Sequence, residues 1–353
     1  MVDRDTEWKE IIRILRSAIL ETDICRFVLI FGDYGMGKSF ILTEIYRKAN
    51  QTRGVLAVRD VIAQRPMPTR SLIQGTREAE FDISRNIIVG LGPLKVVELI
   101  NKAKDSKSKG KFGSIFKLIG EGSDDAWRFL TGDRLTRKEL EDLGVKEPLR
   151  TPDAMVAALF EVLRLVKRAD YSTLLVLVDE FEFVRAQLGD KAVVNVLDAL
   201  RSIFDEFASI KTEAAKVVFV FGVSSQAWDK IMDLDASMRV KTGGGGIAPF
   251  TERILPSDRV TLQPWSEEAT LLLVRSRLEE VRGSNSGQPF APFSEDAVRY
   301  IHKVSQQKPR FVLQNCFMVL EEASKDEATK SIDAAYSEKV LSRFNVATIP
   351  AEE

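Results

Sequence analysis

One glycine-rich stretch carries the residues whose types and spacing most clearly suggest chemistry. It reads Gly32-Asp33-Tyr34-Gly35-Met36-Gly37-Lys38-Ser39 and fits the pattern G-x-x-x-x-G-K-[ST], between an apolar run and a helical pattern. Glycines let the backbone wrap around phosphate groups so that its N–H groups face the anion. We expect Lys38 to place its charge at the β- and γ-phosphates and the Ser39 hydroxyl to bind Mg²⁺. The predicted nucleotide-binding stretch extends through Phe40.

An acidic pair follows another apolar run and supplies the second half of such a site. The run is Leu174-Leu175-Val176-Leu177-Val178, and Asp179-Glu180 comes directly after it. We expect Asp179, at the tip of a buried strand, to complete the Mg²⁺ site. Glu180 is then placed to polarise an attacking water. Glu182 is the alternative for this base, and the pair could instead be ordinary loop sequence.

The elements that must position these residues alternate between strands and helices. Apolar runs of strand length, typical of parallel strands covered on both faces, span residues 26–32, 54–59, 174–178, 217–223 and 259–262. Helical patterns span residues 6–20, 40–48 and 151–168. The alternation predicts an α/β fold with an open parallel sheet and helices on both faces.

After Pro264 the sequence predicts helices only. Ser266 and Ser294 are good N-caps for the first two of them. The expected helices span residues 266–282, 294–306, 309–324 and 331–344. Residues 264–353 are therefore predicted to form an all-helical domain, and residues 1–60 and 151–263 the sheet core.

The spacing between two of the strands is abnormally long. About 120 residues separate the strand starts at Gly54 and Leu174, whereas one crossover unit needs roughly 30. Residues 61–150 are therefore an insertion. Its middle, residues 101–114, is rich in Lys, Ser and Gly and is predicted to be a mobile loop. Residues 61–119 contain eleven basic and five acidic residues, so this part of a near-neutral chain is basic.

Composition excludes several other classes of protein. The chain has 353 residues and a net charge of −1, so charge by itself does not indicate a nucleic-acid partner. Its two cysteines, Cys25 and Cys316, and its one histidine, His302, argue against a disulfide framework, a zinc site and a Ser-His-Asp triad. With no membrane-spanning run and no apolar signal segment, we expect a soluble, cytoplasmic protein without a membrane partner.

The order of these features resembles the AAA+ ATPases and, within them, the ORC/Cdc6-like group, whose prokaryotic relatives occur in replication, transposition and phage-defence systems. The resemblance covers roughly residues 5–60 and 151–325 and leaves out the insertion. It implies a P-loop NTPase core with a helical lid, ATP and Mg²⁺ as cofactors, and hydrolysis of ATP to ADP and phosphate.

The resemblance also implies two sensor residues. VVFVFGVSSQAW, from Val217 to Trp228, looks like the strand that ends in the sensor-1 residue. That residue would be Ser225, or next Ser224, where the family more often has Asn or Thr; the alternative is a serine pair that caps the following helix. KPRF, which contains Arg310, looks like the sensor-2 motif of the lid. Arg310 would then reach the γ-phosphate, and the alternative is an arginine facing solvent.

A further stretch, FTERI, resembles the arginine-finger box of the family. Arg253 in this stretch would stabilise charge on the phosphoryl group bound by a neighbouring subunit. Arg239 and Arg259 are alternatives, and so is a surface arginine without this role. A trans-acting arginine implies a homo-oligomer, either a ring or a filament, in the presence of ATP.

Some features depart from the family pattern. The sequence ends at Glu353 without a recognisable C-terminal winged-helix domain, so we expect the usual double-stranded DNA anchor of replication initiators to be lacking. The insertion after the second strand is also unusual. The four glycines at 243–246 predict a hinge, or a segment ordered only by a neighbour.

Two functions remain open, and a third fits poorly. The first is a loader or remodeller that acts on or with DNA, with the basic stretch from Lys102 to Lys117 following a phosphate backbone. The second is a STAND-like or defence-system switch whose insertion binds a protein partner. A small-molecule kinase would leave the sensor-like arginines unexplained.

Overall fold

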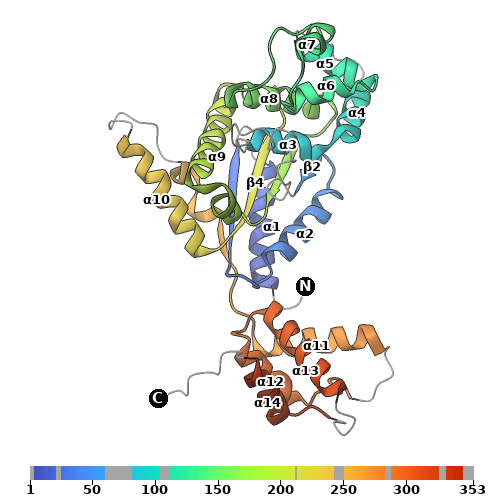
Figure 1. Cartoon of the computed structure of the whole chain (residues 1–353), viewed down its shortest axis with the longest axis vertical. Coiled ribbons are helices and arrows are strands. Elements are labelled where there is room, and N and C mark those ends of the chain that lie inside the picture. Colours follow the sequence, from blue (N-terminus) through green and yellow to red (C-terminus); the bar gives the residue numbers. More distant parts are fainter. Residues whose placement is uncertain are drawn as a thin grey trace. The chain divides into compact units, whose positions relative to one another are not determined.

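The computed structural model describes residues 4–20, 25–59, 82–103, 111–210, 213–241, 250–282, 288–325 and 331–344. The chain forms two compact units (Figure 1). The larger consists of Ile12–Phe31 and Ser39–Val260, and the smaller of Met1–Ile11, Gly32–Lys38 and Thr261–Glu353. The glycine-rich loop therefore belongs to the same unit as the C-terminal helices.

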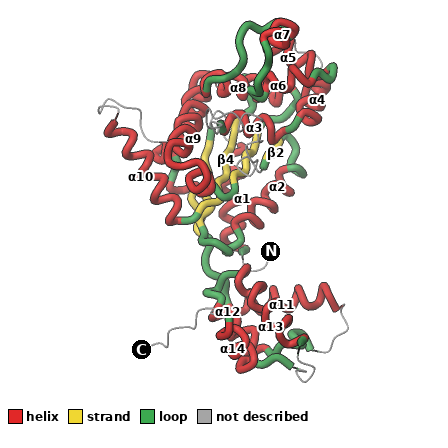
Figure 2. Tube along the Cα trace, viewed as in Figure 1, coloured by secondary structure: helices red, strands yellow, loops and turns green. Residues whose placement is uncertain are grey.

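A five-stranded sheet forms the centre of the larger unit, and Figure 2 shows its strands side by side. The strands are β1 (Arg26–Phe31), β2 (Val55–Val58), β3 (Thr173–Val178), β4 (Lys216–Val223) and β5 (Arg259–Thr261), in the order β2-β3-β4-β1-β5. β4 pairs in parallel with both β1 and β3. Every residue of β3 is buried, as expected for a sheet covered on both sides. The predicted parallel α/β sheet is confirmed.

Helices surround this sheet. They are α1 (Asp5–Leu20), α2 (Lys38–Ala49), α8 (Pro152–Arg168), α9 (Glu182–Ile210) and α10 (Ser225–Lys241), with short 3₁₀ helices η2 (Phe250–Arg253) and η3 (Pro256–Asp258). The N-terminus of α8 matches its sequence signals, because the Thr151 side chain accepts from the Ala154 N–H and Pro152 follows at the first helical position. The sequence did not single out α9, which is interrupted at Gly189, where φ is +79°.

The insertion is helical and packs into the core of the larger unit. Its helices are α3 (Ile83–Leu91), α4 (Pro93–Lys102), α5 (Lys111–Gly120), α6 (Asp124–Leu130) and α7 (Arg137–Asp142). Buried residues of these helices belong to one hydrophobic cluster with the strands. The prediction of a loop over residues 101–114 is wrong at both ends. Residues 101 and 102 belong to α4, and residues 111–114 belong to α5, which buries the apolar side chains of Phe112 and Ile115. Residues 104–110 lie outside the described residues.

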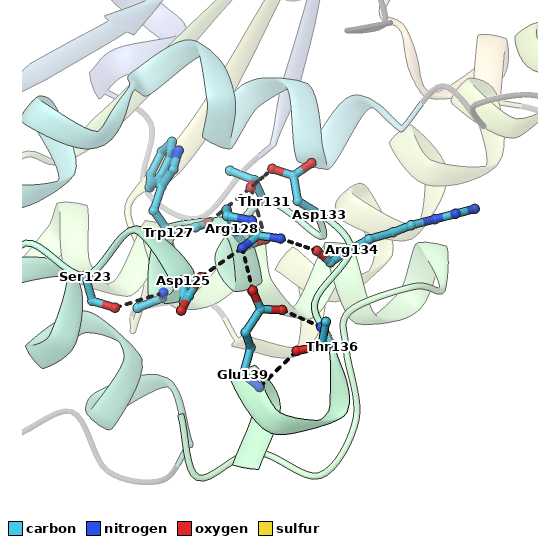
Figure 3. Close-up of polar contacts among 10 residues, drawn as sticks. Ser123, Asp125, Trp127, Arg128, Thr131, Asp133, Arg134, Thr136 and Glu139 are labelled. Carbon is cyan, nitrogen blue, oxygen red and sulfur yellow. Dashed lines mark hydrogen bonds and ion pairs between the residues drawn. The ribbon is translucent and has the colours of Figure 1, made fainter. Parts of the chain in front are cut away.

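Polar contacts hold helices α6 and α7 of the insertion together, as Figure 3 shows. Arg128 of α6 pairs with Asp125 at 2.8 Å and with Glu139 of α7 at 3.0 Å. Glu139 also accepts from the Thr136 N–H, while the Thr136 hydroxyl accepts from the Glu139 N–H, which makes a complete capping box. One arginine thereby joins two short helices, which also bury Phe129, Leu130 and Leu140.

The C-terminal helices have a core of their own. They are α11 (Glu267–Arg282), α12 (Glu295–Val304), α13 (Pro309–Ser324) and α14 (Ala334–Arg343). Buried residues from all four form a separate cluster, among them Val274, Ile301, Val312 and Val340. Ser294 caps α12 by accepting from the Ala297 N–H. The predicted all-helical C-terminal part is confirmed.

Within the described ranges, none of the helices combines the length and the apolar character that crossing a bilayer requires.

Candidate nucleotide-binding site

The glycine-rich loop runs from the end of β1 to the start of α2, which is the arrangement the motif predicts. Lys38 is the first residue of α2, and only 8% of its surface is exposed. Its Nζ donates to the Gly32 carbonyl at 2.7 Å and to the Asp33 carbonyl at 3.4 Å. The ammonium group is thus held inside the loop by neutral carbonyl oxygens. A phosphate oxygen would give it a charged partner there.

Two glycines of the loop adopt backbone conformations that other residues rarely take. Gly35 has φ +86° and Gly37 has φ +96°. A Cβ on Gly35 would lie 3.4 Å from the Cβ of Arg310 and 3.7 Å from that of Lys308. The space beside Gly35 would admit a Cβ at ordinary contact distance, and Gly37 has open space around it, so backbone conformation explains both glycines.

Arg310 and its neighbours lie on this loop within the smaller unit. The Arg310 N–H donates to the Gly35 carbonyl at 3.4 Å, and its guanidinium carbon lies 4.7 Å from the centre of the Tyr34 ring. Lys308 pairs with Asp33 at 3.6 Å. The Phe311 ring lies 6.0 Å from that of Tyr34. The structure thus places the sequence-predicted Arg310 next to the loop, with its guanidinium group packed against the Tyr34 ring.

Sequence reasoning missed Arg4, which also contacts the loop. Arg4 is 3% exposed, pairs with Glu7 at 2.7 Å, and donates to the carbonyls of Met36 at 3.1 Å and Gln263 at 2.5 Å. Its guanidinium lies 5.9 Å from the Trp265 ring. Arg4 therefore joins the N-terminal segment, the loop and the segment before α11. Only the i,i+3 pairing with Glu7 was visible in the sequence, and such pairs are common on helix surfaces.

Asp179 and Glu180 follow β3 directly. β1 and β3 both run parallel to β4, and the register pairs Phe31 with Val223 and Val178 with Phe221. The ends of β1 and β3 therefore meet the same edge of the sheet. Glu180 has φ +51°, and its N–H donates to the Asp179 carboxylate at 3.0 Å. A non-glycine residue in this conformation is uncommon and is often found at functional sites.

Glu182, Ser224 and Ser225 are the residues predicted to replace or assist Glu180. Glu182 begins α9, but its side chain lies outside the described part of the structure. Ser224 and Ser225 follow β4, which lies between β1 and β3, so they come at the same sheet edge. The Ser224 hydroxyl accepts from the Ala227 N–H at 3.3 Å and so caps α10, while Ser225 is exposed. The capping alternative thus applies to Ser224. The sensor-1 role of Ser225 stays a prediction.

Arg253 is engaged within its own chain. It pairs with Asp205 of α9 at 3.0 Å, and its guanidinium lies 5.5 Å from the Phe204 ring. Its side chain is 13% exposed. A role in trans requires this pair to open. Of its rivals, Arg259 is half-buried in β5, and the side chain of Arg239 lies outside the described residues.

Within each unit, the residues are of the types that suit a Mg²⁺-nucleotide. The loop offers a buried ammonium group with only carbonyl partners and two glycines in left-handed conformations. The N-terminus of α2 adds backbone N–H groups that attract anions. The exposed Ser39 hydroxyl in its first turn and the Asp179 carboxylate are oxygen donors of the type that Mg²⁺ prefers.

Comparison with known proteins identifies the fold. Neither protein-family models nor the sequences of curated proteins match this chain. The ORC2 protein of Aeropyrum pernix in its ADPNP–ADP complexes is similar in structure, with a TM-score of 0.55, 12% identity, and coverage of 99% of this chain and 70% of that one. Its ADP form gives a TM-score of 0.51 and 11% identity, over 97% of this chain and 68% of that one. The chain therefore has an ORC/Cdc6-like AAA+ fold, as the sequence predicted.

Proposed function

We propose that this protein binds ATP with Mg²⁺, hydrolyses the ATP to ADP and phosphate, and uses the nucleotide to control its assembly. The observation that carries the proposal is the buried Lys38 ammonium group inside a glycine loop between β1 and α2. The similar ORC2 structures hold ADPNP and ADP, which supports a nucleotide as the ligand.

The proposed roles follow from the positions of the side chains. Lys38 exchanges its carbonyl partners for phosphate oxygens, and Ser39 and Asp179 hold the metal ion. When bound, Mg²⁺ neutralises charge on the phosphate oxygens. Glu180, at the same sheet edge, orients the attacking water and takes up its proton. Arg310 supplies a second positive charge from α13, next to the loop.

Turnover of ATP by the purified chain tests this proposal, with Glu180→Gln as the blank. The variant keeps the shape of the side chain but cannot accept the proton. We expect it to bind ATP and to lose about 100-fold or more in rate, the usual contribution of a positioned base. Wild-type turnover in Glu180→Gln would transfer the role to Glu182. Absence of ATP binding by the wild type would remove the whole proposal.

We further propose that the ATPase acts on or with DNA, and that it is cytoplasmic. The basic composition of residues 61–119 and the resemblance of the sequence to the ORC/Cdc6-like group support a DNA partner. The second candidate is a switch that acts through a protein bound by the insertion. It is favoured by helices α3–α7 of the insertion, whose buried residues pack into the same hydrophobic cluster as the strands. Stimulation of turnover by DNA that fades with salt distinguishes the two, since phosphate contacts weaken steeply as salt rises.

A further inference from the structure

A polar pocket lies at the edge of the sheet opposite to Asp179 and Glu180. It has a volume of about 590 Å³ and is lined by the start of β2 and the turn before it, by the end of α8 and the turn that follows it, and by α4. Figure 1 shows α4, α8 and β2 close together in the larger unit, and α4 contacts α8. One wall thus comes from the insertion and the others from the core. Sites for small ligands commonly have volumes of about 300–1,000 Å³.

Positive charge gathers in this pocket from three separate segments. Among the described residues, the basic ones that line it are Arg53 in the turn before β2, Lys95 and Lys102 on α4, and Arg168 at the end of α8. The only acidic residue among the lining residues described is Asp170. Asn50, Gln51 and Thr52 add neutral polar groups at the same place. The pocket therefore has an excess of hydrogen-bond donors that carry positive charge.

Two of these cations are held close to each other. Lys95 and Lys102 lie 5.5 Å and 5.1 Å from the centre of the Tyr171 ring, and Lys102 donates to the Tyr171 hydroxyl at 3.1 Å. Both pair with the same carboxylate, Glu98, at 2.9 Å and 2.7 Å. The single negative charge of Glu98 neutralises only one of the two ammonium groups, so a net positive charge remains beside the Tyr171 ring.

Helix dipoles stabilise only some of the cations in this pocket. Lys102 and Arg168 lie in the last turns of α4 and α8, where cations are stabilised by the helix dipole. Lys95, however, lies in the first turn of α4, where the dipole disfavours a cation. For Arg168, burial lowers the pKa of the guanidinium, the charge of Glu161 raises it, and that of Arg164 lowers it. A bound anion would offset the unfavourable dipole at Lys95 and the burial of Arg168.

We propose that this pocket binds a phosphate group of a ligand other than the nucleotide at the glycine-rich loop. Lys and Arg side chains together with Asn, Gln and Thr form the set that commonly contacts phosphates of nucleic acids. Nucleic-acid backbone and free polyphosphate share this chemistry. The inference goes beyond the proposed ATPase and does not depend on ATP hydrolysis.

The experiment compares two double variants of the full chain. Lys95→Gln/Lys102→Gln removes two charges from the pocket, and Lys138→Gln/Lys146→Gln removes two exposed charges elsewhere in the insertion. The probes are a labelled single strand of about 20 nucleotides, the corresponding duplex, and pyrophosphate, with affinities measured between about 50 and 200 mM KCl. Pyrophosphate is tested in the Lys38→Ala background, so that binding at the loop does not contribute.

We expect at least one probe to bind the wild type and the control variant and to bind the pocket variant more weakly. For DNA, the slope of log affinity against log salt should fall by about 1 for each phosphate that the variant no longer binds. Weaker binding of DNA identifies a nucleic-acid backbone as the source of the phosphate, and weaker binding of pyrophosphate alone identifies a free phosphate ligand. Arg53→Gln, a change at an exposed turn residue, should weaken the same probe without altering thermal unfolding.

Three results would overturn the proposal. One is that no probe binds the wild type, and another is that the pocket variants bind as the wild type does. The third is that the control variant weakens binding equally, which would mean that general charge is responsible. ATP affinity, measured on the same proteins, should remain unchanged in the pocket variants. Failure of this proposal is thereby separated from failure of the proposed nucleotide site.

Discussion

At the scale of single residues, Lys38 is the first point at which the site can be tested. Lys38→Ala removes the ammonium group that the loop carbonyls now hold. Because a hydrogen bond to a charged group contributes about 1.5–3 kcal/mol, we expect ATP affinity to fall by about 10- to 100-fold. Lys48→Ala, an exposed change on the same helix, should leave it unchanged. Equal affinity of both variants, measured by calorimetry, would contradict the assignment of the loop.

Tyr34 and Arg310 form the second test at this scale. The Tyr34 ring supports the Arg310 guanidinium at 4.7 Å, and an exposed contact of this kind contributes about 0.5–1 kcal/mol. If the ring holds Arg310 ready for the γ-phosphate, Tyr34→Ala should raise the KM for ATP about two- to fivefold.

Tyr34→Phe keeps the ring and is the matched control. It should behave as the wild type, and ADP affinity should change less than ATP affinity in Tyr34→Ala, because ADP has no γ-phosphate. An equal loss for ATP and ADP in Tyr34→Ala would mean that the ring shapes the loop and does not position Arg310.

At the scale of elements, the contact between α6 and α7 gives a pH-dependent prediction. Hydrogen bonds from Thr136 and then from Arg128 lower the pKa of Glu139 from 4.5 to about 2. Because the folded value is the lower one, the charged carboxylate stabilises the fold above the unfolded pKa, and this contribution is lost as the pH falls toward 2. Glu139→Gln should therefore lower the Tm at about pH 7, and its difference from the wild type should shrink as the pH falls below about 4.5.

The control for this prediction is Glu121→Gln, which removes an exposed carboxylate 3.7 Å from Lys117. Such a surface pair contributes little, so its Tm should follow the wild type at every pH. A Glu139→Gln variant whose Tm difference does not vary with pH would show that Arg128 and the capping box act without the charge of Glu139.

Elements also differ in how far the sequence predicted them. β1, β3 and β4 were predicted because unbroken apolar runs of this length fit buried parallel strands, and α8 because Thr151 and Pro152 mark its start. The insertion was not predicted in detail. Its short helices depend on contacts between residues far apart in sequence, such as Arg85 with Asp133, which no local pattern reveals. Arg4 was missed for the same reason, since its partners lie at Met36 and Gln263.

At the scale of the whole molecule, nucleotide-dependent assembly is the remaining proposal, and Arg253 is the residue on which it depends. In the single chain Arg253 is bound to Asp205. Assembly in ATP must therefore exchange this partner for a phosphate on the neighbouring subunit. Turnover per chain should rise with protein concentration, and Arg253→Ala should remove that rise while ATP binding persists. Arg275→Ala, an exposed change on α11, should leave the rise intact.

Mixing two inactive variants tests the trans role directly. Arg253→Ala keeps Glu180 but lacks the arginine, whereas Glu180→Gln keeps the arginine but lacks the base. In a mixed assembly, the arginine of a Glu180→Gln subunit can reach the nucleotide of an Arg253→Ala subunit, which has an intact base. Turnover should therefore reappear on mixing, since an arginine of this kind contributes about 10³–10⁵ in rate. No recovery with Arg253→Ala, but recovery with Arg259→Ala or Arg239→Ala in its place, would assign the trans arginine to one of those residues.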